Sequence, residues 1–296
     1  ADDAAEAQIT AATYDSPDIS FRLKAQNFGF TIPVGVTIDG ITVEIDRRSI
    51  IASSGKDFRV QLLDATGALV GDNKSVPATI WPTTSTIATY GGAADTWNAV
   101  PTQAMVNDPD FGVVLSAQAN IANADIGVDF IRVNVTYTDT QAPKWSQNTT
   151  NGTIIGTFIQ HSVNWTDNIA LSGYIFSFDN GTGTFTNDSF VTFTGTQNWS
   201  NVSKVVNTTK GATIQWRIYA NDSTNNLNST SLFNYTTTGY GTLNVSITNP
   251  VDSSGYFTGN TNLTVNATVS CVGSAGDVCG TVSTTARYNL SANPDT

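Results

Sequence analysis

The sequence predicts an all-β protein built from tandem β-sandwiches. Three observations predict this fold class: apolar and polar residues alternate with a period of two, Gly, Asn, Asp and Pro separate the alternating runs, and long helical patterns are nearly absent. With 296 residues, the chain is long enough for two or three domains. We expect the domain boundaries near residues 140 and 240.

Residues 1–140 contain alternating runs at 41–46, 58–62 and 131–137, each with its apolar side chains on one strand face. Turn sequences rich in Gly, Asp and Pro lie between them. About eight strands of this kind predict a jelly-roll-like sandwich. Residues 138–143 form a linker, after which the charge density falls.

Residues 141–240 alternate in the same way at 159–165, 174–178 and 214–220. With further strands nearby, about seven short strands predict an immunoglobulin-like or fibronectin-like sandwich. Trp165 and Trp216 are the expected core anchors.

Residues 241–296 contain three expected strands, at 243–247, 263–271 and 281–290. Three strands cannot close a sandwich, so this segment is expected to be an incomplete third Ig-like β domain, continued beyond residue 296 or completed by another chain. Cys271 and Cys279 are close in sequence, which favours a disulfide over a metal site, because no further Cys or His lies nearby.

The composition predicts an extracellular location. Charged residues make up only 12% of the chain and the net charge is −11. After residue 140 there are five Lys or Arg and seven Asp or Glu, so Asn, Ser and Thr must keep that surface soluble. A basic patch is absent, which argues against nucleic-acid partners, and no apolar run is long enough for a transmembrane segment. The start at Ala1 fits a mature N-terminus after signal-peptide removal, or a shortened sequence.

The strongest motif is Asn-x-Ser/Thr, the acceptor of N-linked glycans, which occurs seventeen times. An Asn- and Thr-rich chain produces some sequons by chance. Several, however, alternate with apolar neighbours and are expected on the outward strand face; Asn164, for example, lies between Val163 and Trp165. The seventeen are Asn73, Asn134, Asn148, Asn151, Asn164, Asn180, Asn187, Asn198, Asn201, Asn207, Asn221, Asn228, Asn234, Asn244, Asn262, Asn266 and Asn289.

Catalytic motifs are missing from the sequence. The single histidine, His161, shares a face with apolar residues and is expected in the core or at its edge. Glu44 and Asp46 lie beside Arg47 and Arg48; a glycosidase pair is one interpretation, and a solvated strand face the commoner one. We therefore predict no catalytic residues and no enzyme activity.

Ligand sites are weakly indicated. Trp81, Tyr90 and Trp97 lie in a Gly-rich region and are candidate sugar contacts, with core packing as the favoured alternative. No cofactor or metal site is predicted. Calcium is the alternative, because the loops at 72–73, 108–110 and 167–168 supply acidic and amide oxygens.

At segments 165–168, 171–177, 179–183, 197–201 and 215–223, the second unit resembles a repeated Ig-like module of archaeal cell-surface proteins. At segments 27–33, 71–74 and 90–92, the first unit is similar to a β-sandwich module of phage-like and surface proteins. At segments 271–279 and 286–289, the third is similar to the start of another surface-protein domain.

The resemblance implies a secreted, glycosylated, modular protein, such as an extracellular filament subunit (hamus-like), an adhesin or part of a surface layer. We expect a structural subunit that self-assembles with identical copies, with Ala5 to Ala12 as a candidate donor strand. The alternatives are a carbohydrate-binding or adhesive module, and a fragment of a hydrolase whose catalytic domain follows residue 296.

Overall fold

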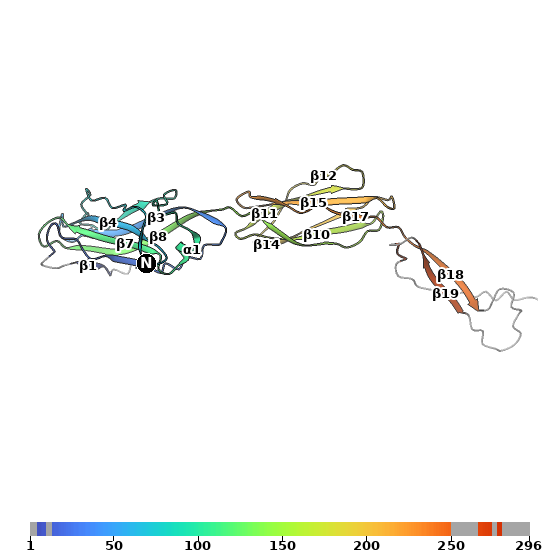
Figure 1. The fold of residues 1–296 in the computed structure, drawn as a ribbon, viewed down its shortest axis with the longest axis horizontal. Helices are drawn as coiled ribbons and strands as arrows, with labels where there is room; N and C mark the ends of the chain where they lie inside the picture. The colour runs from blue at the N-terminus through green and yellow to red at the C-terminus, as the bar shows by residue number, and fades with distance from the viewer. Residues whose placement is uncertain (1–4, 10–13, 250–265, 274–276, 280–296) are drawn as a thin grey trace, which may run out of the picture. The chain divides into compact units, whose positions relative to one another are not determined.

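The computed structural model describes residues 5–9, 14–249, 266–273 and 277–279 (Figure 1). The elements are β-strands apart from one short helix among these residues, which confirms the predicted all-β class. The chain forms two compact units. The first comprises Ala1–Pro143, Asp167–Leu171 and Asn221–Asn226, and the second comprises Lys144–Thr166, Ser172–Ala220 and Leu227–Thr296.

The first unit contains two four-stranded antiparallel sheets, with strand orders β1-β8-β3-β6 and β2-β7-β4-β5. Successive strands switch repeatedly between the two sheets, and this strand order is that of a jelly roll, as predicted. The elements are β1 (Ala7–Ile9), β2 (Leu23–Gln26), β3 (Val36–Ser49), β4 (Gly55–Leu63), β5 (Leu69–Val70), β6 (Thr86–Gly91), α1 (Gln103–Asn107), β7 (Gly112–Ala119) and β8 (Ile126–Asp139).

The core of the first unit follows the alternation in the sequence with one exception. Ile41, Val43 and Ile45 on β3 are fully buried, as expected for a central strand. On β4, however, the register shifts between Asp57 and Arg59. This bulge turns Asp57 inward and leaves Phe58 37% exposed, whereas strict alternation predicts Phe58 on the buried face.

The second unit contains a three-stranded sheet, β14-β10-β9, and a second sheet, β12-β11-β15-β16, in which β13 also pairs with β11 and β17 with β15. Short strands in this arrangement confirm the predicted Ig-like or fibronectin-like sandwich. The elements are β9 (Lys144–Thr150), β10 (Phe158–Thr166), β11 (Leu171–Asp179), β12 (Thr186–Asn187), β13 (Val191–Thr192), β14 (Gln197–Val205), β15 (Thr213–Asp222), β16 (Leu227–Ser229) and β17 (Phe233–Thr236).

The expected faces of β10, β11 and β15 form the core of this sandwich. Trp165 and Trp216 are almost completely buried, and the indole of Trp216 packs against Phe176 with ring centroids 5.8 Å apart. Large aromatic side chains on facing strands therefore fill the space between the sheets.

The last described strands, β18 (Thr242–Asn249) and β19 (Asn266–Val272), pair with each other as a two-stranded antiparallel sheet. They group with the second unit, so the boundary expected near residue 240 stays a prediction. The expected strand at 281–290 lies outside the described residues. The expected donor segment contains β1, which pairs with β8 of its own unit. Within the described residues, no helix is long and apolar enough to cross a membrane.

Candidate functional site

The single histidine is a core residue. His161 is fully buried, its Nε2 lies 3.0 Å from the hydroxyl of Tyr235, and its ring contacts Phe176, Phe178 and Trp216. Burial lowers the pKa of His161 to about 4, because an imidazolium would lose its hydration among these rings. The side chain is therefore neutral at pH 7, and it faces aromatic side chains rather than solvent.

The acidic pair on β3 is engaged in contacts along the sheet. Glu44 forms an ion pair with Arg132, and Asp46 accepts a hydrogen bond from Ser85. Arg47 does not lie beside them, because strand alternation places it on the buried face together with Val43 and Ile45. These contacts favour the solvated-face interpretation over a glycosidase pair.

The three candidate sugar-contact residues are core residues, which corrects the sugar-contact interpretation in favour of the core packing that the sequence already favoured. Trp81, Tyr90 and Trp97 are 1%, 4% and 0% exposed. The indole of Trp97 donates to the carbonyl of Ile41 at 2.7 Å. The indole N–H of Trp81 and the hydroxyl of Tyr90 donate to the buried carboxylate of Asp57. A sugar stacks on an exposed ring face, and none of the three offers one.

The sequon asparagines fall into three groups by exposure. Ten are exposed, namely Asn73, Asn134, Asn148, Asn151, Asn187, Asn201, Asn228, Asn234, Asn244 and Asn266. Four are half-buried, namely Asn180, Asn198, Asn207 and Asn221, and one, Asn164, is buried. Asn262 and Asn289 lie outside the described residues. Most of the expected acceptors that can be placed are thus accessible to a glycan.

Asn164 is the exception that corrects the sequence prediction. It lies on β10, the central strand of its sheet, and is only 6% exposed. Its Nδ2 is 3.5 Å from Ser146 Oγ on β9, and its Oδ1 accepts from Gln197 Nε2 on β14 at 3.3 Å. The outward face of a central strand is thus covered by its two neighbours, and no room remains for a sugar.

The exposed sequons of the second unit concentrate on strands at the sheet edges. β9 and β14 border the three-stranded sheet and carry Asn148 and Asn201. β12, β16 and β17 lie on the outer sides of the other sheet and carry Asn187, Asn228 and Asn234. Edge strands present unpaired backbone groups, so this placement puts the potential glycans where strand pairing with other chains begins.

The predicted disulfide between Cys271 and Cys279 is present, with Cα atoms 5.9 Å apart. Cys271 lies on β19, and Cys279 follows Val278, which bridges to Tyr240. The bond therefore ties the end of the β18–β19 pair to the segment after it. A disulfide is consistent with an oxidising, extracellular compartment.

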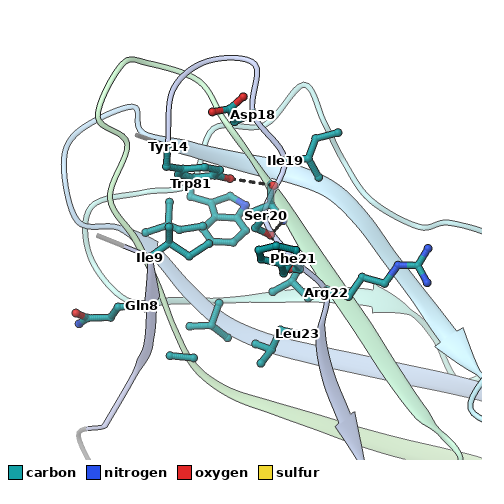
Figure 2. Close-up of a pocket in the computed structure, with 15 residues that line it drawn as sticks. Gln8, Ile9, Tyr14, Asp18, Ile19, Ser20, Phe21, Arg22, Leu23 and Trp81 are labelled. Atoms are coloured by element: carbon teal, nitrogen blue, oxygen red, sulfur yellow. Dashed lines mark hydrogen bonds between the residues drawn. The ribbon is translucent and has the colours of Figure 1, made fainter. Parts of the chain in front are cut away.

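A pocket of about 550 Å³ opens in the first unit between the β1 and β2 edges of the two sheets (Figure 2). Trp81, Tyr14, Ile9 and Leu23 line it, while Phe21 is 98% exposed. Figure 2 shows the charged ends of Asp18 and Arg22 pointing away from its centre. An apolar floor with polar groups at the rim is typical of a small-ligand pocket. Sequence alternation does not reveal it, because the pocket depends on the gap between two sheet edges.

The three loops named as calcium candidates differ in the partners of their aspartate side chains. Asp108 accepts from the backbone N–H of Asp110 at 2.9 Å, and Asp72 lies 3.7 Å from Lys74, so both have local partners. Asp167 instead lies with Asp139 and Asp222; one oxygen from each falls within 4.8 Å of the others. The sequence prediction missed Asp139, which it assigned to a linker, and Asp222.

Comparisons with known proteins are weak. No family model and no curated protein matches the chain. A β-1,2-glucanase from Parabacteroides distasonis is 9% identical with a TM-score of 0.23, and the match covers 73% of this chain and 30% of that one. The tripod (BppUct-A-L) of the bacteriophage Tuc2009 baseplate is 10% identical with a TM-score of 0.20, covering 72% and 73%. TM-scores this low support no argument about function.

Proposed function

We propose that this chain is a non-catalytic, N-glycosylated structural section of an extracellular surface protein that self-assembles into a filament or surface array. The observation that carries the proposal is the placement of exposed sequons on the edge strands of the second unit, such as Asn148 on β9 and Asn187 on β12. A glycan at a sheet edge blocks uncontrolled strand pairing while leaving the sandwich core intact. The low charge of this half makes sugar the main source of solubility.

The half-buried sequons refine the expected glycan pattern. The Nδ2 of Asn180 donates to the carbonyl of Val205 at 3.3 Å, and the Nδ2 of Asn207 donates to the carbonyl of Asn180 at 3.0 Å. Nδ2 is the atom that would bear the sugar, so a glycan at these positions would crowd the carbonyl group that Nδ2 contacts. We expect lower occupancy there than on the edge strands.

The experiment is intact mass and glycopeptide mapping of the secreted protein, before and after deglycosylation. We expect sugar on Asn148, Asn187, Asn201 and Asn234. Asn164 is the internal control, since it carries a complete sequon but is buried. A mass equal to the bare 31.3 kDa chain would exclude the glycosylated role.

Assembly is tested separately by negative-stain microscopy of native material. Ordered filaments or arrays are expected. Dispersed monomers under native conditions would refute the filament part of the proposal and leave the glycan part standing.

A second function, carbohydrate binding in an adhesive module, is favoured by the pocket in Figure 2. Exposed Phe21 supplies a ring face, while Gln8, Asp18 and Arg22 supply polar groups around it. Polysaccharide pull-down with Phe21→Ala tests it. Phe158→Ala, which removes a 74% exposed ring from the second unit, is the matched control. Equal retention of both variants and the unmodified protein would exclude this function for the pocket.

A further inference from the structure

Three carboxylates gather at one end of the first unit. Asp139 ends β8, Asp167 lies in the loop between β10 and β11, and Asp222 ends β15. One carboxylate oxygen from each lies within 4.8 Å of the other two. Asp139 is 4% exposed and Asp222 is 0% exposed. The chain thus brings three acidic side chains, distant in sequence, into a buried cluster.

Local hydrogen bonds hold Asp167 by Oδ1 alone and Asp222 by both oxygens, because the Nδ2 of Asn226 also donates to Oδ2 of Asp222 at 2.8 Å. Oδ1 of Asp167 accepts from the backbone N–H groups of Ile169 and Ala170, both at 2.9 Å. Oδ1 of Asp222 accepts from the backbone N–H groups of Thr224 at 2.9 Å and Asn226 at 2.8 Å. These contacts fix the side chains in place without cancelling their charge.

Other oxygens in the cluster have no partner. Oδ2 of Asp139 and Oδ2 of Asp167 are buried and accept no hydrogen bond. The same is true of Oδ1 of Asn168, whose Nδ2 donates to the carbonyl of Val34 at 3.1 Å and to Oδ1 of Asp139 at 3.0 Å. Buried polar atoms without a partner are uncommon, and these three are oxygens that one bound cation would satisfy together.

Positive charge is also missing from the cluster. Among the described residues, none of the three carboxylates forms an ion pair with Lys or Arg. Buried carboxylates without a counter-charge are costly unless they coordinate a cation.

We propose that Asp139, Asp167, Asn168 and Asp222 form a Ca²⁺ site. All the donors are oxygens, which calcium prefers, whereas zinc prefers nitrogen and sulfur. Calcium–oxygen distances of about 2.3–2.6 Å let two ligands on one ion lie up to about 5 Å apart, so carboxylate oxygens within 4.8 Å of one another can share one ion. Magnesium, at about 2.1 Å, would require the oxygens to come within about 4.2 Å.

The test is calorimetric titration of the chelator-treated protein with CaCl₂, together with thermal unfolding. We expect one calcium per chain and, at about 100 times the dissociation constant, a rise in Tm of about 5 °C or more. MgCl₂ at the same concentration is expected to produce a smaller shift. Absence of saturable binding, or an equal effect of Mg²⁺, would overturn the proposal.

The variant Asp167→Asn tests whether Asp167 is one of the calcium ligands. The amide keeps the Oδ1 that accepts from Ile169 and Ala170 but removes a charge, so calcium affinity is expected to fall more than about tenfold. Without calcium, the same variant is expected to unfold at a higher temperature than the unmodified protein, because repulsion is relieved. An aspartate with a purely structural role would not combine weaker calcium binding with a higher unfolding temperature in the absence of calcium.

Asp110→Asn is the matched control, because it removes one charge from an exposed loop of the same unit. It is expected to bind calcium like the unmodified protein. If Asp167→Asn does not fold, Asp139→Asn replaces it, since Oδ1 of Asp139 is its hydrogen-bonded oxygen and the amide retains it. Unchanged affinity in a folded site variant would overturn the assignment.

Discussion

The carboxylate of Asp57 accepts a hydrogen bond from the indole Nε1 of Trp81 at 2.7 Å, and both side chains are buried in the jelly-roll core. The hydroxyl of Tyr90 donates to the other oxygen of Asp57 at 2.9 Å. Arg47 lies 3.6 Å from the same carboxylate, and its guanidinium stacks over the Trp81 ring at 4.9 Å. A charged network therefore replaces apolar contacts at this point of the core.

Asp57→Asn is expected to destabilise the first unit by about 3 kcal/mol. The amide has a single acceptor oxygen, so it cannot serve both Trp81 and Tyr90, and Arg47 loses its buried counter-charge. Urea unfolding measures the loss. Asp46→Asn is the control, because its bond from Ser85 needs only Oδ1; we expect a cost below about 1 kcal/mol. Equal costs would show that the buried network contributes little.

Gly91 offers a second test of the same core. Its φ is +70°, and a Cβ added there would lie 2.3 Å from both the carbonyl oxygen of Ile41 and Nε1 of Trp97. Those two atoms are hydrogen-bonded to each other, so neither can move without loss. Gly91→Ala is therefore expected to cost both backbone strain and overpacking.

A substitution at Gly29 measures the backbone strain without the overpacking. The φ of Gly29 is +71°, but a Cβ there meets nothing within 4 Å. Gly29→Ala should cost only the left-handed backbone strain, roughly 1 kcal/mol. We expect Gly91→Ala to exceed it by about 1–3 kcal/mol in urea unfolding. A difference near zero would mean that the side chains around Trp97 can shift to accommodate the added methyl group at little cost in stability.

The faces of the strands could be predicted from sequence because backbone geometry imposes alternation on every strand. Ile41 and Trp216 are buried for this reason. Bulges break the rule: the shift between Asp57 and Arg59 depends on how neighbouring strands pair, which a single run of residues does not encode. Phe58 is exposed as a result, whereas Arg47 is buried in the same phase as Val43 and Ile45.

The candidate sites were harder to predict, because they depend on position within a sheet or on contacts between distant loops. Asn164 and Asn201 both carry sequons, but the first lies on a central strand and the second on an edge. Alternation cannot distinguish the two cases. Similarly, Asp139 and Asp222 lie far apart in sequence, and only the fold places them beside Asp167.

The buried histidine makes stability depend on pH. In the unfolded chain His161 titrates near pH 6.5, whereas burial lowers its folded pKa to about 4. Between these values the unfolded state binds more protons, so the free energy of unfolding increases with pH. The contribution of neutral His161 is fully present above about pH 6.5 and is lost as the pH falls towards 4. The total loss is on the order of 3 kcal/mol.

Urea unfolding at intervals from pH 4 to 7, with His161→Phe as the comparison, tests this expectation. Phenylalanine fits among Phe176 and Trp216 but leaves the hydroxyl of Tyr235 without its partner, so the variant is expected to be less stable at pH 7. Carboxylates titrate in both proteins, so the difference between the two curves isolates the histidine. We expect this difference to shrink as the pH falls. Parallel curves would mean that His161 has the same pKa in the folded and unfolded states, which its aromatic surroundings oppose.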